Sequence, residues 1–227
     1  MSRTKLADRP FPDYTKGEEV MNMVTHIVGA AFGVLALVMC ILRSCEHGNV
    51  WGIVSSSIYG GSIITLYSVS AVYHGLPKNM GKKVMQVIDH CTIFLLIAGS
   101  YTPITLAGIR TASVTFCWII FGIVWGISAV GTVFTAIDHD KYATFSMSCY
   151  IGIGWCLLIA LKPTIQAMTL EGFLWLLSGG LMYTIGAVFY VFASRNQSER
   201  HYIHSVFHIF VVAGTILQFW SIYKYIL

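Results

Sequence analysis

The stretch from residue 112 to residue 135 reads ASVTFCWIIFGIVWGISAVGTVFT and contains no charged side chain. A helix needs about 20 consecutive apolar residues to cross the hydrocarbon core of a bilayer, so this stretch is long enough to span it. In lipid every backbone amide must find its hydrogen-bond partner within the segment, which makes such a run helical. A transmembrane barrel would instead show alternating polarity over segments of about 10 residues. This segment therefore predicts a helical membrane protein.

The same pattern recurs along the chain of 227 residues, of which 56% are apolar and 11% charged. A soluble domain carries about twice that charged fraction. We therefore expect an all-α, polytopic membrane protein of seven transmembrane helices, forming a single domain over residues 22–227. Residues 1–21 are predicted to be a cytoplasmic tail with the start of the first helix, and residues 1–19 are polar enough to be solvated. The predicted spans are residues 22–42, 50–74, 87–108, 112–135, 143–161, 170–193 and 203–225.

The basic residues are divided unequally between the two sides of this arrangement. One side carries four of them, Arg43, Arg110, Lys162 and Lys224. The N-terminal segment and the even-numbered loops carry ten: Arg3, Lys5, Arg9, Lys16, Lys78, Lys82, Lys83, Lys141, Arg195 and Arg200. The positive-inside rule then places the N-terminus in the cytoplasm and, after seven spans, the C-terminus outside. The spans predict a multi-pass protein of the plasma or inner membrane. Because the basic residues form no single patch, we expect no nucleic-acid partner.

Two further features of the spans concern helix packing. Pro103, within the third predicted span, lacks a backbone N–H and should kink that helix. Two glycine pairs, Gly60-Gly61 and Gly179-Gly180, are typical of positions where membrane helices approach each other closely.

Histidines mark the candidate site. His204 and His208 are four residues apart at the start of the seventh span, which places both imidazoles on one helix face. His74 closes the second span and Asp89 opens the third, both on the predicted cytoplasmic side. Ionisable side chains at such depth are usually paired, metal-bound or functional. Neutral imidazole suits zinc, and the six cysteines include no CxxC pair, so the pattern predicts a zinc ion held by histidine.

Taken singly, each of these residues has a simpler explanation. A histidine at a helix end is more often an interfacial residue than a ligand, and only the joint pattern at one depth favours metal. Asp89 could close the site as a fourth ligand, or it could hold a zinc-bound water, as in a catalytic site with three protein ligands. Ser70, one turn before His74, could bond near the metal or back to its own helix. The sequence leaves these alternatives open.

A second polar cluster lies on the first span. Glu19, Asn22 and His26 share one helix face at the same predicted level as the histidines. They could support the metal ligands or line the substrate site, but Glu19 could equally favour the positive end of its helix while the others pack locally. Four more histidines have no such partners and are expected to be loop or interface residues: His47, His90, His139 and His201.

The polar residues together form three motifs: Glu19-x2-Asn22-x3-His26, Ser70-x3-His74 with a following Asp89, and His204-x3-His208. These motifs resemble those of the progestin and adipoQ receptor (PAQR) superfamily. The length, the short tail and the stretch from Gly99 to Ile104 are most similar to its bacterial hemolysin III branch, and the resemblance covers residues 17–225. The long tail or extracellular domain of the receptor members is missing, which argues against hormone reception.

The resemblance implies a seven-helix fold, zinc bound by His74, His204 and His208, and a water held between the metal and Asp89. Relatives in the superfamily, including adiponectin receptors and alkaline ceramidases, are associated with hydrolysis of lipid amides. The name hemolysin refers to cell lysis and describes no chemistry.

The preferred hypothesis is a zinc-dependent hydrolase of lipid amides or esters, with membrane lipids as substrate or ligand. Zinc would polarise the carbonyl and lower the pKa of its water toward about 7. Asp89 would act as general base and then acid, and Ser70 would orient the water or the oxyanion.

The alternative is a non-enzymatic sensor, regulator or cytolysin in which zinc is structural. Pore formation is less favoured because no span shows a sustained polar stripe. A transporter is less favoured because seven spans give no clean repeat.

Overall fold

Capping at Thr15 fixes where the first long helix begins. In the computed structural model, which describes residues 4–195 and 201–227, helix α1 runs from Lys16 to Glu46. The Thr15 hydroxyl accepts a hydrogen bond from the Glu18 amide at 3.3 Å, and the Glu18 carboxylate accepts one from the Thr15 amide at 2.8 Å. This reciprocal pair satisfies two backbone donors at the helix start. The helix therefore begins before the predicted span at residue 22.

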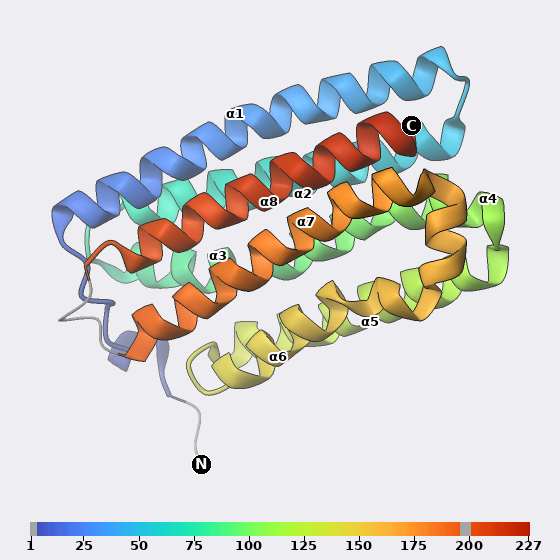
Figure 1. Ribbon diagram of the computed structural model, residues 1–227. Coiled ribbons are helices and arrows are strands. Elements are labelled where there is room, and N and C mark those ends of the chain that lie inside the picture. The colour runs from blue at the N-terminus through green and yellow to red at the C-terminus, as the bar shows by residue number, and fades with distance from the viewer. Residues whose placement is uncertain (1–3, 196–200) are drawn as a thin grey trace.

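The rest of the described chain is also helical, as predicted, and contains no strand. The other elements are η1 (Leu6–Asp8), α2 (Val50–Gly75), α3 (Met80–Pro103), η2 (Ile104–Ile109), α4 (Arg110–Ala112), α5 (Val114–Asp138), α6 (Ala143–Gly154), η3 (Cys156–Ala160), α7 (Leu161–Arg195) and α8 (Ile203–Tyr225). Helix α1 packs against α2 and α8, α3 against α2 and α5, and α7 along α8. The long helices form one bundle, with η1 near one end of it and the C-terminus at the other (Figure 1).

Six segments in the described residues are long and apolar enough to cross a membrane: Lys16–Glu46, Val50–Gly75, Met80–Ala112, Val114–Asp138, Ala143–Phe192 and Ile203–Tyr225. Apart from residue 193, the predicted spans 143–161 and 170–193 both fall within Ala143–Phe192. That segment is 50 residues long, and a straight helix of that length would extend about 75 Å. Instead the backbone leaves the helical conformation at Thr169, and α6 and the longer part of α7 run in opposite directions (Figure 1).

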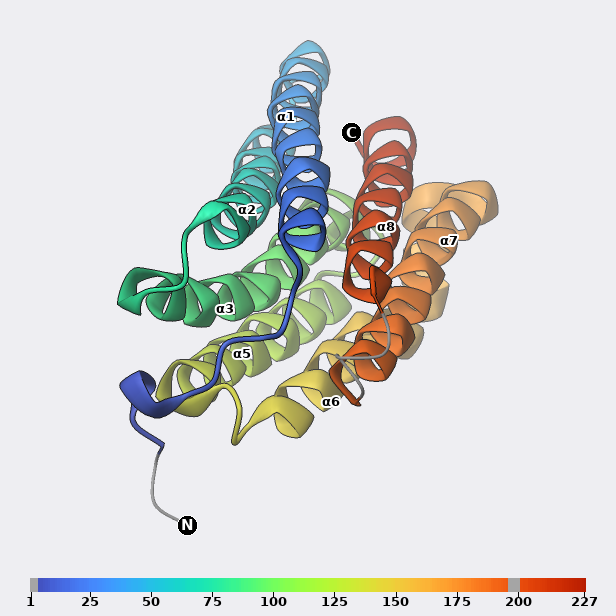
Figure 2. The ribbon, with the colours of Figure 1, turned by 90° about the vertical axis from the view of Figure 1, so that its left-hand side faces the viewer.

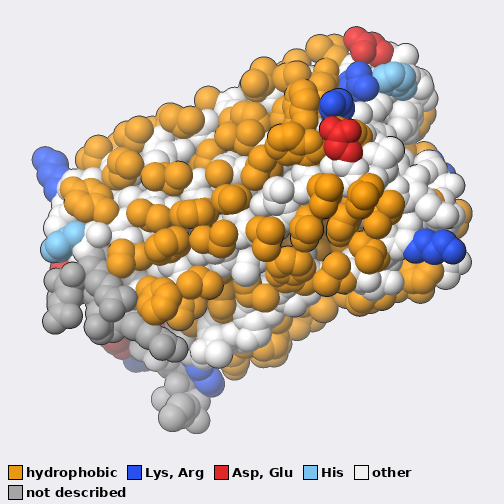
Figure 3. All heavy atoms as spheres, in the orientation of Figure 1, with side chains coloured by type: hydrophobic (Ala, Val, Ile, Leu, Met, Phe, Trp, Pro, Cys, Tyr) orange, Lys and Arg blue, Asp and Glu red, His pale blue; other side chains and the backbone are white. Residues whose placement is uncertain are grey.

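Apolar side chains cover the outside of the bundle. Figure 3 shows them over most of one face, with charged side chains near the two ends. Many serine, threonine and tyrosine side chains are buried inside, among them Ser56, Tyr67 and Thr215. This distribution matches a bundle surrounded by lipid, where the outward face needs no polar groups.

The kink expected at Pro103 takes the form of a change in helix type. Helix α3 ends at Pro103 and continues directly as a buried π-helical turn, η2. The Thr105 hydroxyl donates a hydrogen bond to the Tyr101 carbonyl at 2.9 Å. Proline lacks the N–H that would donate a backbone hydrogen bond in an α-helix, and a wider π-helical turn accommodates the loss of that bond.

Most of the described residues before α1 are exposed, as expected of a solvated tail, but the segment also contacts the bundle. They cross one end of the bundle next to α3 and α5 (Figure 2). The Arg9 side chain is buried and lies 3.4 Å from the Asp138 carboxylate at the end of α5. A charged group can be buried in this way because it is paired there.

The contact between α7 and α8 depends on Gly179, and alanine there should destabilise the protein. A Cβ at Gly179 would lie 2.9 Å from the Gly214 carbonyl oxygen, whereas a Cβ at Gly180 would meet nothing within 4 Å. We expect Gly179→Ala to cost about 1–3 kcal/mol, because backbone cannot yield as a side chain can. Gly180→Ala is the matched control and should leave stability unchanged or slightly raised. Thermal unfolding in detergent checks this, and equal melting temperatures for the two variants would contradict it.

Candidate metal centre

Three histidines from two helices converge inside one end of the bundle. His74 lies in the last turn of α2, and His204 and His208 lie in the first turns of α8. One ring nitrogen from each lies within 4.8 Å of the others, and the Nε2 atoms of His204 and His208 are 3.1 Å apart. His74 and His208 are buried, and His204 is partly exposed. The sequence-predicted ligand set therefore comes together in space.

Hydrogen bonds orient two of these rings toward a common point. The Nδ1 atom of His74 lies 2.7 Å from a carboxylate oxygen of Glu19 and donates to it. The Nδ1 atom of His208 lies 3.3 Å from the Asn22 carbonyl oxygen. In a neutral imidazole the opposite nitrogen then carries the lone pair. The Nε2 atom of His74 is buried and has no hydrogen-bond partner within residues 4–195 and 201–227.

This arrangement fits a zinc ion. Nitrogen ligands lie about 2.0–2.1 Å from zinc, so two of them on a tetrahedral ion are about 3.3 Å apart. The His204–His208 separation of 3.1 Å is close to that value. Lone pairs facing each other without a proton or cation would repel, and a buried nitrogen without a partner is costly. A proton on His204 would satisfy the His204–His208 contact, whereas the Nε2 atom of His74 has no partner in the described residues and a bound cation would satisfy it.

The residues predicted on the first span surround this cluster. Glu19 contacts His74 with one carboxylate oxygen, and its other oxygen lies 2.8 Å from the Lys82 ammonium. Asn22 accepts a hydrogen bond from the Ser205 hydroxyl at 2.6 Å. His26 stacks on His208 with ring centroids 3.7 Å apart and an angle of 8° between the planes. All three residues thus lie next to the histidine cluster or its supporting helix.

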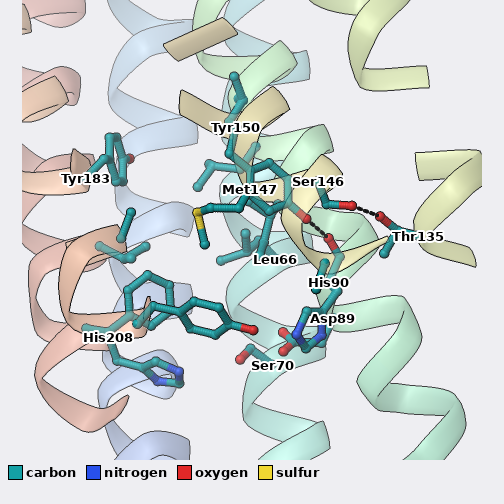
Figure 4. A pocket seen from close by; sticks show the side chains of 18 of the residues that line it. Leu66, Ser70, Asp89, His90, Thr135, Ser146, Met147, Tyr150, Tyr183 and His208 are labelled. Atoms are coloured by element: carbon teal, nitrogen blue, oxygen red, sulfur yellow. Dashed lines mark hydrogen bonds between the residues drawn. The ribbon is translucent and has the colours of Figure 1, made fainter. Parts of the chain in front are cut away.

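Asp89 and Ser70 lie together beside the cluster. Figure 4 shows the side chains of Ser70 and Asp89 close to each other at the wall of one cavity. Asp89 is not among the groups whose ligand atoms all lie within 4.8 Å of one another. Its carboxylate is therefore farther from at least one of the ligand nitrogens. The two residues are placed where they can act on a molecule in the cavity.

The cavity has a volume of about 450 Å³ and extends between the helices from the histidines toward the middle of the bundle (Figure 4). Most of its lining is apolar, including Leu66, Ile93, Leu96, Ile97 and Val211. Ligand cavities in proteins commonly enclose about 300–1,000 Å³. Histidine and acidic side chains of the lining, among them Asp89 and His208, lie at one end, whereas hydroxyl groups such as that of Tyr183 lie farther along it (Figure 4). An elongated, mainly apolar molecule with a polar end would match this distribution.

His90 and His139 lie outside the histidine cluster, as expected, but both line the cavity. His90 lines the cavity directly after Asp89 and hydrogen-bonds the Gln86 carbonyl at 2.7 Å. The His139 ring lies 5.1 Å from the His90 ring and contacts Arg9. His201 lies 3.5 Å from the Glu18 carboxylate, and His47 bonds the Arg43 carbonyl at the other end of the bundle.

Sequence reasoning also missed Lys82 and Tyr14. Lys82 counted only as a basic residue of a loop, yet its ammonium group is buried against Glu19. Tyr14 belonged to the predicted tail, yet its ring stacks on His204 with centroids 5.1 Å apart. A spacing pattern within one helix could find neither, because both contacts join segments far apart in the chain.

Known proteins resemble this chain along almost its whole length. The Haemolysin-III related family matches residues 14–219. Hemolysin-3 of Bacillus cereus is 32% identical over 210 residues, which cover 92% of this chain and 92% of that protein. The Hemolysin-3 homolog of Bacillus subtilis (strain 168) is 32% identical over 212 residues, or 93% and 96% of the two chains. The human Monocyte to macrophage differentiation factor is 27% identical over 217 residues, or 92% and 84%.

Replacing Glu19 by glutamine should weaken metal binding. The carboxylate fixes the orientation of the His74 ring, and loss of such a partner typically costs 10–100-fold in metal affinity. We expect a loss in this range, measured on purified protein by competition with a chromophoric chelator. Lys82 keeps its backbone acceptors at Leu76 and His74, so the fold should persist. Glu46→Gln, an exposed change at the far end of α1, is the control, and equal affinities for the two variants would refute the role.

Proposed function

The chain belongs to the Haemolysin-III related family, and we propose that it is a zinc-dependent hydrolase acting on an amide or ester of a membrane lipid. The match over residues 14–219 and the bacterial and human relatives confirm the family predicted from the motifs, and they identify a multi-pass membrane protein. One observation carries the proposal: three histidine nitrogens converge beside Asp89 at the wall of a mainly apolar cavity.

We propose that the chain crosses the membrane seven times, with its N-terminus in the cytoplasm. The reversal of direction within Ala143–Phe192 supports two crossings by that segment. The excess of basic residues at the end where α1 begins supports a cytoplasmic location for that end. The histidine cluster would then lie near the cytoplasmic face of the membrane.

His74, His204 and His208 would hold the zinc ion. When bound, zinc supplies Lewis acidity, which polarises a carbonyl group and makes water more acidic. Residues around the cluster orient two of the three imidazoles: Glu19 accepts from His74, and the Asn22 carbonyl accepts from His208. This is the support that metal-binding histidines generally receive.

Asp89 would move the protons of the reaction. Its carboxylate accepts a proton from the water that attacks the acyl carbon, and returns it to the leaving nitrogen or oxygen as the bond to that carbon breaks. The products are a carboxylic acid and an amine or alcohol. The Ser70 side chain lies beside Asp89 in the cavity, where its hydroxyl can position the carboxylate and offer its oxygen to the water (Figure 4). A carboxylate outside the set of ligand atoms within 4.8 Å is free for this role.

The lining of the cavity supports a lipid substrate. An acyl chain would lie among the apolar side chains while its carbonyl group lies at the polar end, next to the histidines and Asp89. Binding of the chain along the cavity would fix the carbonyl in place before the attack, which is a large part of catalysis by positioning.

A non-enzymatic role for zinc remains the second candidate, and one observation favours it. Glu19 of α1 bonds His74 of α2 and Lys82 of α3, so the histidine cluster belongs to a network that joins helices. Such a site could serve a sensor, a regulator of membrane composition or a cytolysin. The two candidates differ in what Asp89 does, because a structural site has no need of a base beside it.

Asp89→Asn should separate the two. As the general base, Asp89 should contribute at least 100-fold to the rate, so the variant should keep about one zinc per chain and lose hydrolysis. The double variant His204→Ala, His208→Ala should lose both. Purified proteins are compared by elemental analysis and by product release from ceramides and other acylated lipids, with the exposed change Asp8→Asn as control.

Two outcomes would count against the proposal in different ways. If wild-type protein holds one zinc but releases no product from the lipid panel, the hydrolase hypothesis is rejected and a structural zinc site remains. If wild-type protein holds no stoichiometric metal, the proposed zinc site itself is rejected.

The proposed orientation is tested at Cys45. This cysteine is exposed near the end of α1, opposite to the histidine cluster. A membrane-impermeant maleimide should label it in intact cells, and Cys45→Ala should abolish that labelling. Labelling that requires permeabilised cells would reverse the orientation.

A further inference from the structure

Residues 9–14, which we call the strap, cross the end of the bundle that holds the histidine cluster (Figure 2). The strap connects η1 to the cap of α1. Four of its side chains line the cavity: Pro10, Phe11, Pro12 and Tyr14. The proposed reaction uses none of them, so their position requires a separate explanation.

One end of the strap is held by Arg9. Its guanidinium group donates to the Nδ1 atom of His139 at 2.8 Å and to the Ile137 carbonyl at 3.3 Å, and it lies 3.4 Å from the Asp138 carboxylate. Only 3% of Arg9 is exposed. Charge-assisted hydrogen bonds are stronger than neutral ones, and a buried charge deprived of them is costly. Arg9 therefore anchors the strap to the end of α5.

His139 extends this anchor. Because its Nδ1 accepts from Arg9, its Nε2 carries the proton and donates to the Asp140 carboxylate at 3.1 Å. This hydrogen bond lowers the pKa of Asp140 below its usual value. The carboxylate stays ionised and lies 3.9 Å from the Arg9 guanidinium, which it further stabilises.

The other end of the strap covers the histidine cluster. The Tyr14 ring stacks on His204, with centroids 5.1 Å apart and an angle of 25° between the planes, and lies 6.0 Å from His74. Between the two ends, Lys83 of α3 lies over the Phe11 ring at 4.9 Å and bonds the Ala7 carbonyl. Pro10 and Pro12 restrict the backbone between them, which makes the strap stiff.

We propose that the strap is the wall that separates the cavity and the histidine cluster from the aqueous phase, with Arg9 as the positioning residue that holds Tyr14 over His204. Access from water then requires Arg9 to leave its partners on α5 and the following turn. The part of this proposal in which the strap shields a metal ion depends on the proposed zinc site. The part in which the strap closes the cavity does not. The two parts are therefore tested separately.

The first test follows zinc removal by EDTA from purified, zinc-loaded protein. If release follows transient opening of the strap, its rate tracks the population of the open form. Loss of charge-assisted hydrogen bonds should raise that population about tenfold or more. We expect Arg9→Ala and Tyr14→Ala to release zinc at least that much faster than wild type. Tyr14→Phe, which keeps the ring, and Lys5→Ala, an exposed cation of the same segment, should match wild type.

The second test needs no metal. Gln86 is 7% exposed and lines the cavity, so Gln86→Cys provides a reporter inside it. In metal-free protein, Arg9→Ala should raise the rate at which an impermeant maleimide labels position 86 about tenfold, as read by peptide mass spectrometry, whereas Lys5→Ala should not.

Equal rates in both tests for variants that remain folded would overturn the proposal. If Arg9→Ala lowers the melting temperature, the comparison of Tyr14→Ala with Tyr14→Phe decides. If the protein binds no zinc but shows the expected labelling, the strap's role as a wall is supported and the zinc site is rejected.

Discussion

The carboxylate of Glu19 joins three helices at the level of the histidine cluster. It accepts from His74 of α2, lies 2.8 Å from the Lys82 ammonium of α3, and belongs to α1. In a bundle surrounded by lipid, burial of apolar side chains gives little preference for one helix contact over another. Polar contacts such as this one therefore help to determine which helices pack together. The same contact fixes the tautomer of His74 and so directs its other nitrogen to the cluster. One carboxylate thus serves both the packing of the helices and the geometry of the site.

The remaining polar groups are arranged around this contact. Asn22 and His26, one and two turns further along α1, contact Ser205 and His208 of α8. Helix α8 in turn packs closely against α7 at Gly179 and Gly214, where the two backbones are nearly in contact. The cavity is left where the helices around it do not close on each other, and its polar end coincides with the histidines. The site is therefore a consequence of how the helices pack.

Much of this arrangement was predictable from spacing along single helices. The period of 3.6 residues places Glu19, Asn22 and His26 on one face, and His204 beside His208. Long apolar runs then set the depth of each residue relative to the others. Contacts of Arg9, Tyr14, His90 and His139 were not predictable in this way. They join a segment before the first helix to α3, α8 and the end of α5, and no periodicity within one element relates such positions.

The sequence by itself determined that the chain is a helical membrane protein and which histidines meet, because backbone satisfaction in lipid and helix geometry act locally. It also determined the family through its motifs. The tertiary structure decided that the strap covers the cluster, that His139 bridges Arg9 and Asp140, and that the cavity opens beside Asp89. These features arise from packing between distant segments. The buried charge of Arg9 is stable only because carboxylates on other elements meet it there.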